Sequence, residues 1–348
     1  MAVPIVKPGE AEFPLNTWYV AAFSREVKPG ELLGRTICGK PLVLYRRNDG
    51  TPVALFDRCP HRGMPLSMGK LVGNDRLQCT YHGLEFVPSG QCALVPSQDH
   101  VPPFMTVKAY PVTEKWKWLW VWPGDPDKAD PALIPDHDYL GFERNGWETH
   151  DGLVMHLNAN YLLPFENLVD ATHISYLHHG LIDDGNAART PYELTQDGIR
   201  VRLTREIRNE VVMGRPAQDR TLVLEGHAPQ LCLIQQEINP SATPDARIST
   251  NLVIALTPET PRSTHQFTAN AGSPGSGARR GSWQEQDAFL LKLLTEDVVA
   301  IEAIQRLHDS IPAEERVEVS QRADAGAART RRIIAEMIAC ERPGEVAG

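Results

Sequence analysis

Two pairs of metal-binding side chains stand on similar short segments near the start of the chain. The segment R-C-P-H-R-G-M supplies Cys59 and His61, and the segment C-T-Y-H-G-L supplies Cys79 and His82. Thiolates and imidazoles in this combination bind zinc in structural sites, and they also bind iron in some iron–sulfur clusters. Gly63 and Gly83, one in each segment, suit tight loops that present backbone N–H groups to sulfur. The sequence therefore predicts a first metal site built from two loops.

A second candidate metal site lies in the stretch N-L-V-D-A-T-H-I-S-Y-L-H, which ends at His178. Asn167, Asp170 and His173 are spaced so that they share one face of a helix. Two imidazoles with carboxylates nearby suit a divalent transition metal better than Ca²⁺ or Mg²⁺, which prefer oxygen ligands. An ideal helix turns the directions of His173 and His178 apart by about 140°. Both can reach one metal only if the helix ends or bends, so we predict a break at residues 174–177.

The elements that must position the first site look like short β-strands. Apolar runs such as W-Y-V-A-A, P-L-V-L-Y and P-V-A-L-F alternate with Gly, Pro, Asn and Asp, which predicts an all-β domain. The run W-K-W-L-W-V-W then places tryptophans on alternate positions, a pattern more typical of a packed core than of a ligand platform. We expect an N-terminal arm at residues 1–14 and a first domain at residues 15–125. The Pro- and Asp-rich stretch 123–131 marks the boundary.

The remainder, residues 126–340, reads as an α+β domain, followed by a disordered tail at residues 341–348. Residues 181–191 are expected to form a loop, and residues 283–309 a long helix with apolar side chains at helical spacing. Strand-like segments with hairpin-length gaps predict one antiparallel sheet; they are residues 198–207, 220–226, 231–238, 249–258 and 264–270.

Composition narrows the class of partner. The chain has 348 residues, of which 42% are hydrophobic and 23% charged, as in ordinary globular proteins. Its net charge of −9 argues against nucleic acid or an anionic membrane as the partner. No apolar run reaches membrane-spanning length, and the first residues lack the apolar core of a signal peptide. We therefore expect a cytoplasmic protein whose six cysteines are mostly reduced.

The paired C-x-H and C-x-x-H segments resemble the Rieske 2Fe–2S motif, in which two cysteines bind one iron and two histidines bind the other. Neither loop carries the additional cysteine of respiratory Rieske proteins, since Cys38 and Cys92 lie outside both loops. Followed by N-x-x-D-x-x-H-x-x-x-x-H, the motif resembles the oxygenase component of Rieske non-haem iron oxygenases. The resemblance implies an N-terminal Rieske domain and a helix-grip-like catalytic domain, an antiparallel sheet flanked by helices.

The same resemblance implies that His173 and His178 bind a mononuclear Fe(II) together with a distant carboxylate. Asp297 matches the family's position for this third ligand, and Glu296 and Glu302 are the competing carboxylates. Three other histidines are expected to support the ligands or to lie at the surface, namely His150, His156 and His179.

In the family, an aspartate links the two metal centres across a subunit boundary. Carried to this sequence, Asp170 links His82 of one chain to His173 of another, which implies a homotrimer; the alternative is a carboxylate that only orients His173. Asn167 either acts near the open side of the iron or is an ordinary polar residue at the start of the helix.

The implied reaction needs electrons from outside the chain. The sequence has no G-x-G-x-x-G fingerprint and no second cysteine cluster, so a separate reductase or ferredoxin using NAD(P)H and flavin is expected. The chain looks like the vanillate and dicamba O-demethylase branch, monooxygenases that use O₂ to hydroxylate a methyl or N-alkyl carbon of a small aromatic compound and release formaldehyde. Two alternatives remain, a ring cis-dihydroxylating dioxygenase and an electron-transfer Rieske protein.

The substrate pocket is expected between the iron-binding stretch and the sheet. Each candidate taken alone is more often structural than substrate-binding; the candidates are Leu233, Gln235, Asn251, Ile254, Arg262, His265 and Phe267.

Overall fold

The computed structural model describes residues 13–341, except residues 74, 184, 212–216, 241–246 and 277–280. The chain divides into two compact units, Leu15–Ile134 and a second unit formed by the residues from Pro135 onward, to which Phe13 and Pro14 also belong. The boundary follows the Pro- and Asp-rich stretch because that stretch is bound to the first unit: Trp18 Nε1 donates to the Asp130 carbonyl at 2.8 Å. The expected tail falls almost wholly outside the described residues, and of the expected arm only Phe13 and Pro14 are described.

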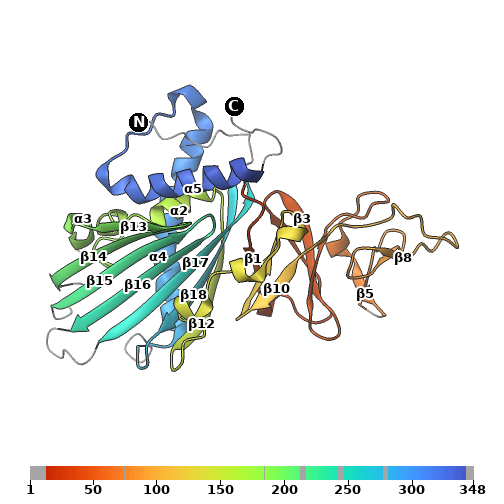
Figure 1. The fold of residues 1–348 in the computed structure, drawn as a ribbon, viewed down its shortest axis with the longest axis horizontal. Coiled ribbons are helices and arrows are strands. Elements are labelled where there is room, and N and C mark those ends of the chain that lie inside the picture. Colours follow the sequence, from red (N-terminus) through yellow and green to blue (C-terminus); the bar gives the residue numbers. More distant parts are fainter. Residues whose placement is uncertain are drawn as a thin grey trace. The chain divides into compact units, whose positions relative to one another are not determined.

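The first unit consists of three small antiparallel sheets (Figure 1). Their strand orders are β1-β11-β10, β2-β3-β4-β9 and β5-β6-β7-β8. The all-β prediction is confirmed, with strands β1 (Tyr19–Phe23), β2 (Leu33–Ile37), β3 (Lys40–Arg46), β4 (Pro52–Phe56), β5 (Lys70–Val72), β6 (Arg76–Gln78), β7 (Glu85–Phe86), β8 (Cys92–Leu94), β9 (Ala109–Tyr110), β10 (Val112–Lys115) and β11 (Trp118–Val121).

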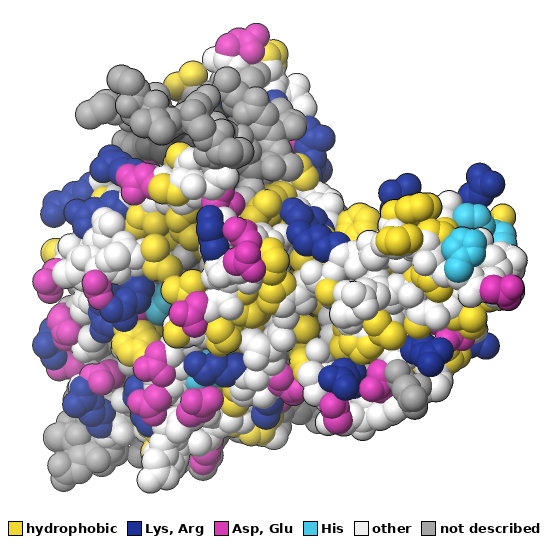
Figure 2. All heavy atoms as spheres, turned by 45° about the vertical axis from the view of Figure 1, so that its right-hand side comes forward, with side chains coloured by type: hydrophobic (Ala, Val, Ile, Leu, Met, Phe, Trp, Pro, Cys, Tyr) yellow, Lys and Arg dark blue, Asp and Glu magenta, His cyan; other side chains and the backbone are white. Residues whose placement is uncertain are grey.

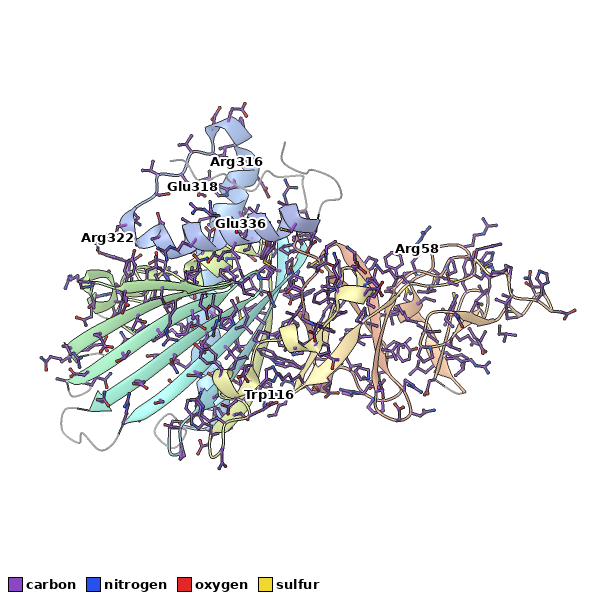
Figure 3. The ribbon with its side chains drawn as sticks, viewed as in Figure 1. Arg58, Trp116, Arg316, Glu318, Arg322 and Glu336 are labelled. Carbon is purple, nitrogen blue, oxygen red and sulfur yellow. The ribbon has the colours of Figure 1, made fainter. Side chains whose placement is uncertain are left out.

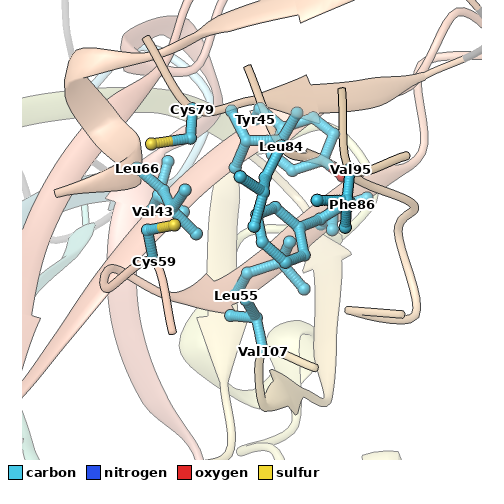
Figure 4. Packing of buried hydrophobic residues seen from close by; sticks show 12 residues of the cluster. Val43, Tyr45, Leu55, Cys59, Leu66, Cys79, Leu84, Phe86, Val95 and Val107 are labelled. Atoms are coloured by element: carbon cyan, nitrogen blue, oxygen red, sulfur yellow. The ribbon is translucent and has the colours of Figure 1, made fainter. Parts of the chain in front are cut away.

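The tryptophan run forms core rather than a ligand platform. Trp118, Trp120 and Trp122 are buried, whereas Trp116 lies in the turn before β11 with a φ of 57° (Figure 3). A second apolar cluster packs between the β3–β4 hairpin and the β5–β8 sheet, and it includes Cys59 and Cys79 (Figure 4). The two metal-binding loops are therefore anchored by their cysteines in a packed core.

The second unit is built on a seven-stranded antiparallel sheet of order β12-β18-β17-β16-β15-β14-β13 (Figure 1). All five strands expected from the sequence are present, as β14 (Arg200–Glu210), β15 (Gln218–His227), β16 (Leu231–Pro240), β17 (Ile248–Thr260) and β18 (Ser263–Gly272). Two further strands complete the sheet, β12 (Glu148–Leu157) and β13 (Glu193–Asp197), whose polar residues hide the alternation that reveals a strand.

Helices flank this sheet. The long helix α4 (Trp283–Ser310) begins with a capping box, in which Ser282 and Glu285 satisfy each other's backbone N–H groups. The helix α5 (Ala325–Glu341) is held by Arg331, which binds Glu166 and Glu318. The other helices are α1 (His137–Leu140), α2 (Leu162–Leu168) and α3 (Asn186–Arg189). α3 interrupts the segment expected as a loop.

Candidate metal centres and substrate cavity

The two Cys/His loops of the first unit share one backbone design. The Cys59 N–H donates to the Met64 carbonyl at 2.8 Å, and the Cys79 N–H donates to the Leu84 carbonyl at 2.8 Å. In each loop a glycine, Gly63 or Gly83, donates back to the cysteine carbonyl at 2.9 Å and has a positive φ. The fold therefore presents two equivalent loops at one end of the domain.

In the two loops, the two cysteines lie next to each other, and the two histidines lie next to each other. The rings of His61 and His82 are 4.5 Å apart and both residues are exposed, whereas both cysteines are 1% exposed. Burial, together with the adjacent Cys79 thiol, raises the pKa of Cys59 to about 11. Figure 2 shows histidine side chains at the surface of the first unit, beside hydrophobic and basic ones.

This segregation fits a two-iron cluster better than zinc. Four ligands of one zinc ion lie within about 4 Å of one another, as bond lengths near 2.0–2.3 Å require. In the described part of the chain, no three of these four side chains bring their ligand atoms within 4.8 Å of one another. A 2Fe–2S cluster instead takes two thiolates at one iron and two imidazoles at the other, which matches the observed pairs.

In the second unit, one group of three side chains meets that distance test. The ligand atoms of His173, His178 and Asp297 lie within 4.8 Å of one another. The Asp297 carboxylate Oδ1 is 3.1 Å from His178 Nε2 and 3.7 Å from His173 Nε2. Two imidazoles and one carboxylate converging from one side form the ligand set of non-haem iron sites with open positions. These residues therefore fit a mononuclear iron.

The chain breaks where the two histidines require it. Helix α2 ends at Leu168, and a single 3₁₀ turn, His173–Ser175, carries the first histidine. The predicted break is confirmed, but it begins earlier than expected. Asp170 and His173 therefore do not continue the helical face of Asn167, which lies in the last turn of α2 rather than at its start.

Each of the two imidazoles is oriented by a hydrogen bond at Nδ1, the ring nitrogen that does not face Asp297. His173 Nδ1 bonds to the backbone carbonyl of Asp170 at 2.5 Å, and His178 Nδ1 bonds to Glu296 Oε2 at 2.8 Å. These bonds leave both Nε2 atoms facing Asp297, as expected for metal ligands. Asn167 Nδ2 donates to Asp297 Oδ1 at 3.2 Å, so Asn167 holds the carboxylate directly.

Burial and charge act in opposite directions on the two imidazoles. Burial lowers the pKa of His173, despite the nearby Asp297 carboxylate. Burial also opposes the charged form of His178, but the hydrogen bonds that the charged ring donates to Asp297 and Glu296 outweigh it and raise the pKa of His178. Two carboxylates therefore face His178, and Asp297 is the one that both histidines share.

The remaining predicted residues have separate partners. The Asp170 carboxylate accepts hydrogen bonds from the Thr172 N–H and hydroxyl, not from the His173 ring. Glu302 accepts from Asn158, away from the histidines, and His179 is exposed. The other two histidines pair with carboxylates outside the ligand set, His150 with Asp287 and His156 with Glu259.

A cavity of about 390 Å³ opens beside the three candidate ligands, between the sheet, α4 and the His173–His178 segment. This volume is in the range of small-molecule sites. Apolar side chains line much of it, among them Leu168, Ile174, Leu224, Ile234, Leu252 and Leu294. A polar part is formed by Glu210, Gln218, Arg220, Gln236, Thr250 and Gln286.

The cavity corrects our prediction of the substrate-lining residues. The sheet side of the cavity is formed by even-numbered residues of β15 to β18. One row of residues that pair across these strands is Leu224, Ile234, Leu252 and Asn270. Ile254 lies on this face as predicted, but successive strand residues point to opposite faces. The odd-numbered candidates therefore point away from it, namely Leu233, Gln235, Asn251, His265 and Phe267.

The displaced candidates have structural contacts instead. Asn251 Nδ2 donates to the Leu140 carbonyl at 2.8 Å, and Phe267 is fully buried. Arg262 lies in the turn before β18 and binds Asp309. Sequence reasoning missed the cavity residues Glu210, Arg220 and Gln236. Strand periodicity assigned from the apolar Leu222, Leu224 and Ile234 identifies the last two.

Comparisons with known proteins agree with this architecture. The Rieske [2Fe-2S] domain family matches residues 17–111, and the vanillate O-demethylase oxygenase C-terminal domain family matches residues 157–340. The iron-sulfur subunit of a toluene-4-sulfonate monooxygenase system from Comamonas testosteroni is 30% identical, with 95% of this chain and 99% of that protein covered. The oxygenase component of dicamba O-demethylase from Stenotrophomonas maltophilia is 34% identical, with 84% and 88% covered.

A solved structure has the same fold over nearly the whole chain. The crystal structure of dicamba monooxygenase bound to dicamba superposes with a TM-score of 0.84 at 33% identity, with 95% of this chain and 99% of that one covered. Another structure of dicamba monooxygenase, with a TM-score of 0.78 at 32% identity, contains non-haem iron and dicamba.

Proposed function

We propose a dealkylating reaction for this chain, which belongs to the Rieske non-haem iron oxygenases of the vanillate O-demethylase type and is the oxygenase component of such a monooxygenase. Its substrate is a small aromatic compound with an O-methyl or N-alkyl group, and hydroxylation of that carbon releases an aldehyde. The observation that carries this proposal is the His173/His178/Asp297 group at the wall of a largely apolar cavity.

The chain's own residues divide the work between two centres. We assign Cys59, His61, Cys79 and His82 to the Rieske cluster, and His173, His178 and Asp297 to the iron. The bound iron supplies O₂ activation, with electrons delivered through the cluster. The apolar cavity wall excludes water and orients the ring of the substrate, with its alkyl group toward the three ligands.

Glu296 and Asn167 are positioning residues in this scheme. Glu296 fixes the ring of His178, and Asn167 fixes the Asp297 carboxylate. A protein that only transfers electrons needs neither the positioned His178 and Asp297 side chains nor the adjoining cavity. We therefore prefer the oxygenase reading to that of an electron-transfer protein.

We also propose the partners. A separate reductase or ferredoxin, itself reduced by NAD(P)H and flavin in the cytoplasm, feeds the cluster. Within a homotrimer, the Asp170 carboxylate receives a hydrogen bond from His82 of a neighbouring subunit. The exposure of His82, and the fixed position of Asp170 beside His173, support this connection.

The trimer and the Asp170 connection have separate tests. Light scattering of the purified protein should give three times the mass of the chain. Asp170→Asn should slow single-turnover product formation by the pre-reduced enzyme, with both metal centres still loaded. An unchanged rate removes Asp170 from the electron path.

The reaction is tested with methoxy- and N-methyl-substituted aromatic compounds, a surrogate reductase and O₂. Formaldehyde should appear in a one-to-one ratio with the dealkylated product. A cis-diol from the same compounds identifies the dioxygenase alternative instead. Consumption of O₂ with neither product, across the panel, contradicts the proposed reaction.

A further inference from the structure

Two residues of the polar part of the cavity, Glu210 and Arg220, form a buried charge cluster with Asp183, which lies behind them. Arg220 on β15 donates through Nη2 to Glu210 Oε1 at 2.5 Å and to Asp183 Oδ1 at 3.3 Å. The side chains of Arg220, Glu210 and Asp183 are 6%, 1% and 0% exposed. Arg220 is the one Lys or Arg among the described residues that line the cavity. With two carboxylates and one guanidinium, the cluster carries one excess negative charge when all three groups are ionised.

A bulge in the sheet brings Glu210 to this face. Ile207 pairs with Arg220 and Glu210 pairs with Gln218, so two residues of β14, Arg208 and Asn209, lie opposite one residue of β15, Asp219. In a regular strand, Glu210 and Ile207 lie on opposite faces, but the additional residue turns Glu210 onto the face of Ile207. The bulge contains Asn209 with a φ of 53°, held by a hydrogen bond from its N–H to Asp219. The strand is therefore distorted at the position that aims Glu210 into the cavity.

The carboxylates of Asp183 and Glu210 differ in how fully their oxygens are hydrogen-bonded. Asp183 accepts from the Ser175 hydroxyl and from the Gly185 and Ala187 N–H groups as well as from Arg220, so it serves the loop that carries the iron ligands. Glu210 has one oxygen on Arg220, whereas its Oε2 is buried without a partner among the described residues. Burial raises the pKa of Glu210, the Arg220 guanidinium opposes this effect, and the neighbouring Asp183 carboxylate adds to it.

An unpaired buried carboxylate oxygen is costly unless a ligand completes its hydrogen bonding. We propose that Glu210 Oε2 accepts a hydrogen bond from an amino, ammonium or hydroxyl group of the aromatic substrate, so that this oxygenase selects donor-bearing substrates over aromatic carboxylates. The inference rests on the proposed function for the identity of the reacting group, but the recognition by Glu210 can be measured without turnover.

Arg220 is a poor anchor for a substrate carboxylate, although it is cationic. Its Nη2 is shared by two carboxylates, and its Nη1 lies 3.4 Å from Gln236 Oε1. Nε is the guanidinium nitrogen without a partner in the described structure. An incoming anion gains that single N–H while it lies against the Glu210 carboxylate, and like charges in a buried site repel strongly.

The test compares four ligands of one shape. Meta-methoxybenzylamine, meta-methoxybenzyl alcohol, meta-methoxytoluene and meta-methoxybenzoate are titrated calorimetrically into the full-length protein with both metal centres loaded. We expect the amine and the alcohol to bind about tenfold more tightly than the toluene, the gain typical of one hydrogen bond to a charged group. The benzoate should bind most weakly.

The variant Glu210→Gln tests whether the charge of Glu210, rather than the shape of the cavity, determines which ligand binds best. The substitution should weaken binding of the amine about tenfold and leave the affinity for the toluene unchanged. It should also reduce the difference in affinity between the benzoate and the other ligands. Glu206→Gln is the matched control, because Glu206 lies on the same strand but is exposed and bonded to Thr221. If Glu210→Gln does not fold, Glu210→Asp keeps the charge, and the ranking of ligands by the unmodified protein still decides the matter.

The outcomes are distinct. Benzoate binding as tight as that of the amine, no binding of the amine, or an unchanged ranking in Glu210→Gln each overturns the assignment; the last result identifies the cluster as a structural ion pair only. Formaldehyde release is then measured with the same four compounds. Binding that depends on Glu210 without formaldehyde keeps the recognition and rejects the proposed dealkylation.

Discussion

The two metal centres are assembled in opposite ways. The four candidate cluster ligands lie on two adjacent loops with the same backbone hydrogen bonds, so each loop forms its half of the site locally. The candidate iron ligands come from one irregular segment and from a helix far along the chain: Asn167 and its partner Asp297 are 130 residues apart. One centre therefore depends on loop geometry, and the other depends on the packing of the whole second unit.

This difference predicts how each centre fails. Loss of a cluster ligand destroys a covalent assembly, because iron and sulfide need all four ligands. Loss of an iron ligand leaves the fold and the cluster intact, because the iron site lies in another compact unit. Substitution of a supporting residue changes affinity or rate by degrees.

Cys79→Ala should have the largest effect. Removal of one thiolate should abolish the visible absorbance and the electron paramagnetic resonance signal of the Rieske cluster, together with all turnover. Cys340→Ala is the control, because Cys340 is exposed and lies in the other unit. A normal Rieske spectrum in Cys79→Ala refutes the assignment of the two loops.

His178→Ala should abolish turnover while the Rieske spectrum persists. Iron content should fall from about three atoms per chain to two, because the cluster holds two irons and the mononuclear site one. His179→Ala provides the control at the next position, where the side chain is exposed. Activity retained in His178→Ala would remove this residue from the ligand set and break the comparison between the two centres.

Glu296→Ala should have an intermediate effect, because Glu296 orients His178 without being shared by both histidines. Loss of such a supporting carboxylate lowers metal affinity or activity by about 10–100-fold. Iron affinity, measured by competition with a chelator, and kcat should both fall, whereas Asp297→Ala should bind no mononuclear iron.

Glu302→Gln is the control for this prediction, on the same helix but bonded to Asn158. If Glu296→Ala loses the iron completely and Asp297→Ala retains it, the two carboxylates exchange roles. This result matters because both were candidates for the third ligand on sequence grounds.

The contrast also explains what the sequence could predict. The candidate cluster ligands, the all-β domain and five strands of the large sheet follow from local patterns. The helix break between His173 and His178 follows from the geometry of two ligands five residues apart. Asp297 could be chosen only through the family resemblance, because nothing local distinguishes it from Glu296.

The cavity was predicted less well, because its lining depends on strand parity and on a bulge. Our candidates included Gln235 and Asn251, which are one residue out of phase with the cavity face. A one-residue phase error moves every side chain to the other face of a sheet. The sequence pattern could not place Glu210 in the cavity. The bulge at Asn209, one residue before Glu210, changes which residues of the strand face the cavity.

The smallest predicted effect compares the two cluster loops with each other. Gly63 and Gly83 have φ values of 78° and 75°, so alanine at either position costs about 1–2 kcal/mol of folding free energy from the backbone. A Cβ at Gly83 lies 3.0 Å from Pro96 Cγ in a rigid ring, whereas a Cβ at Gly63 lies 3.4 Å from the flexible Arg58 side chain. Gly83→Ala should therefore destabilise the domain more than Gly63→Ala.

Guanidinium unfolding followed through the cluster absorbance measures the difference. Gly30→Ala gives the backbone cost alone, because Gly30 has a φ of 82° and no atom within 4 Å of the added Cβ. If Gly83→Ala matches Gly30→Ala, the loop moves away from Pro96 freely, and the two loops are equivalent in energy as well as in hydrogen bonding. A larger loss at Gly83 shows that similar backbones differ in the packing behind them, so local motif and surrounding core jointly determine the stability of the cluster site.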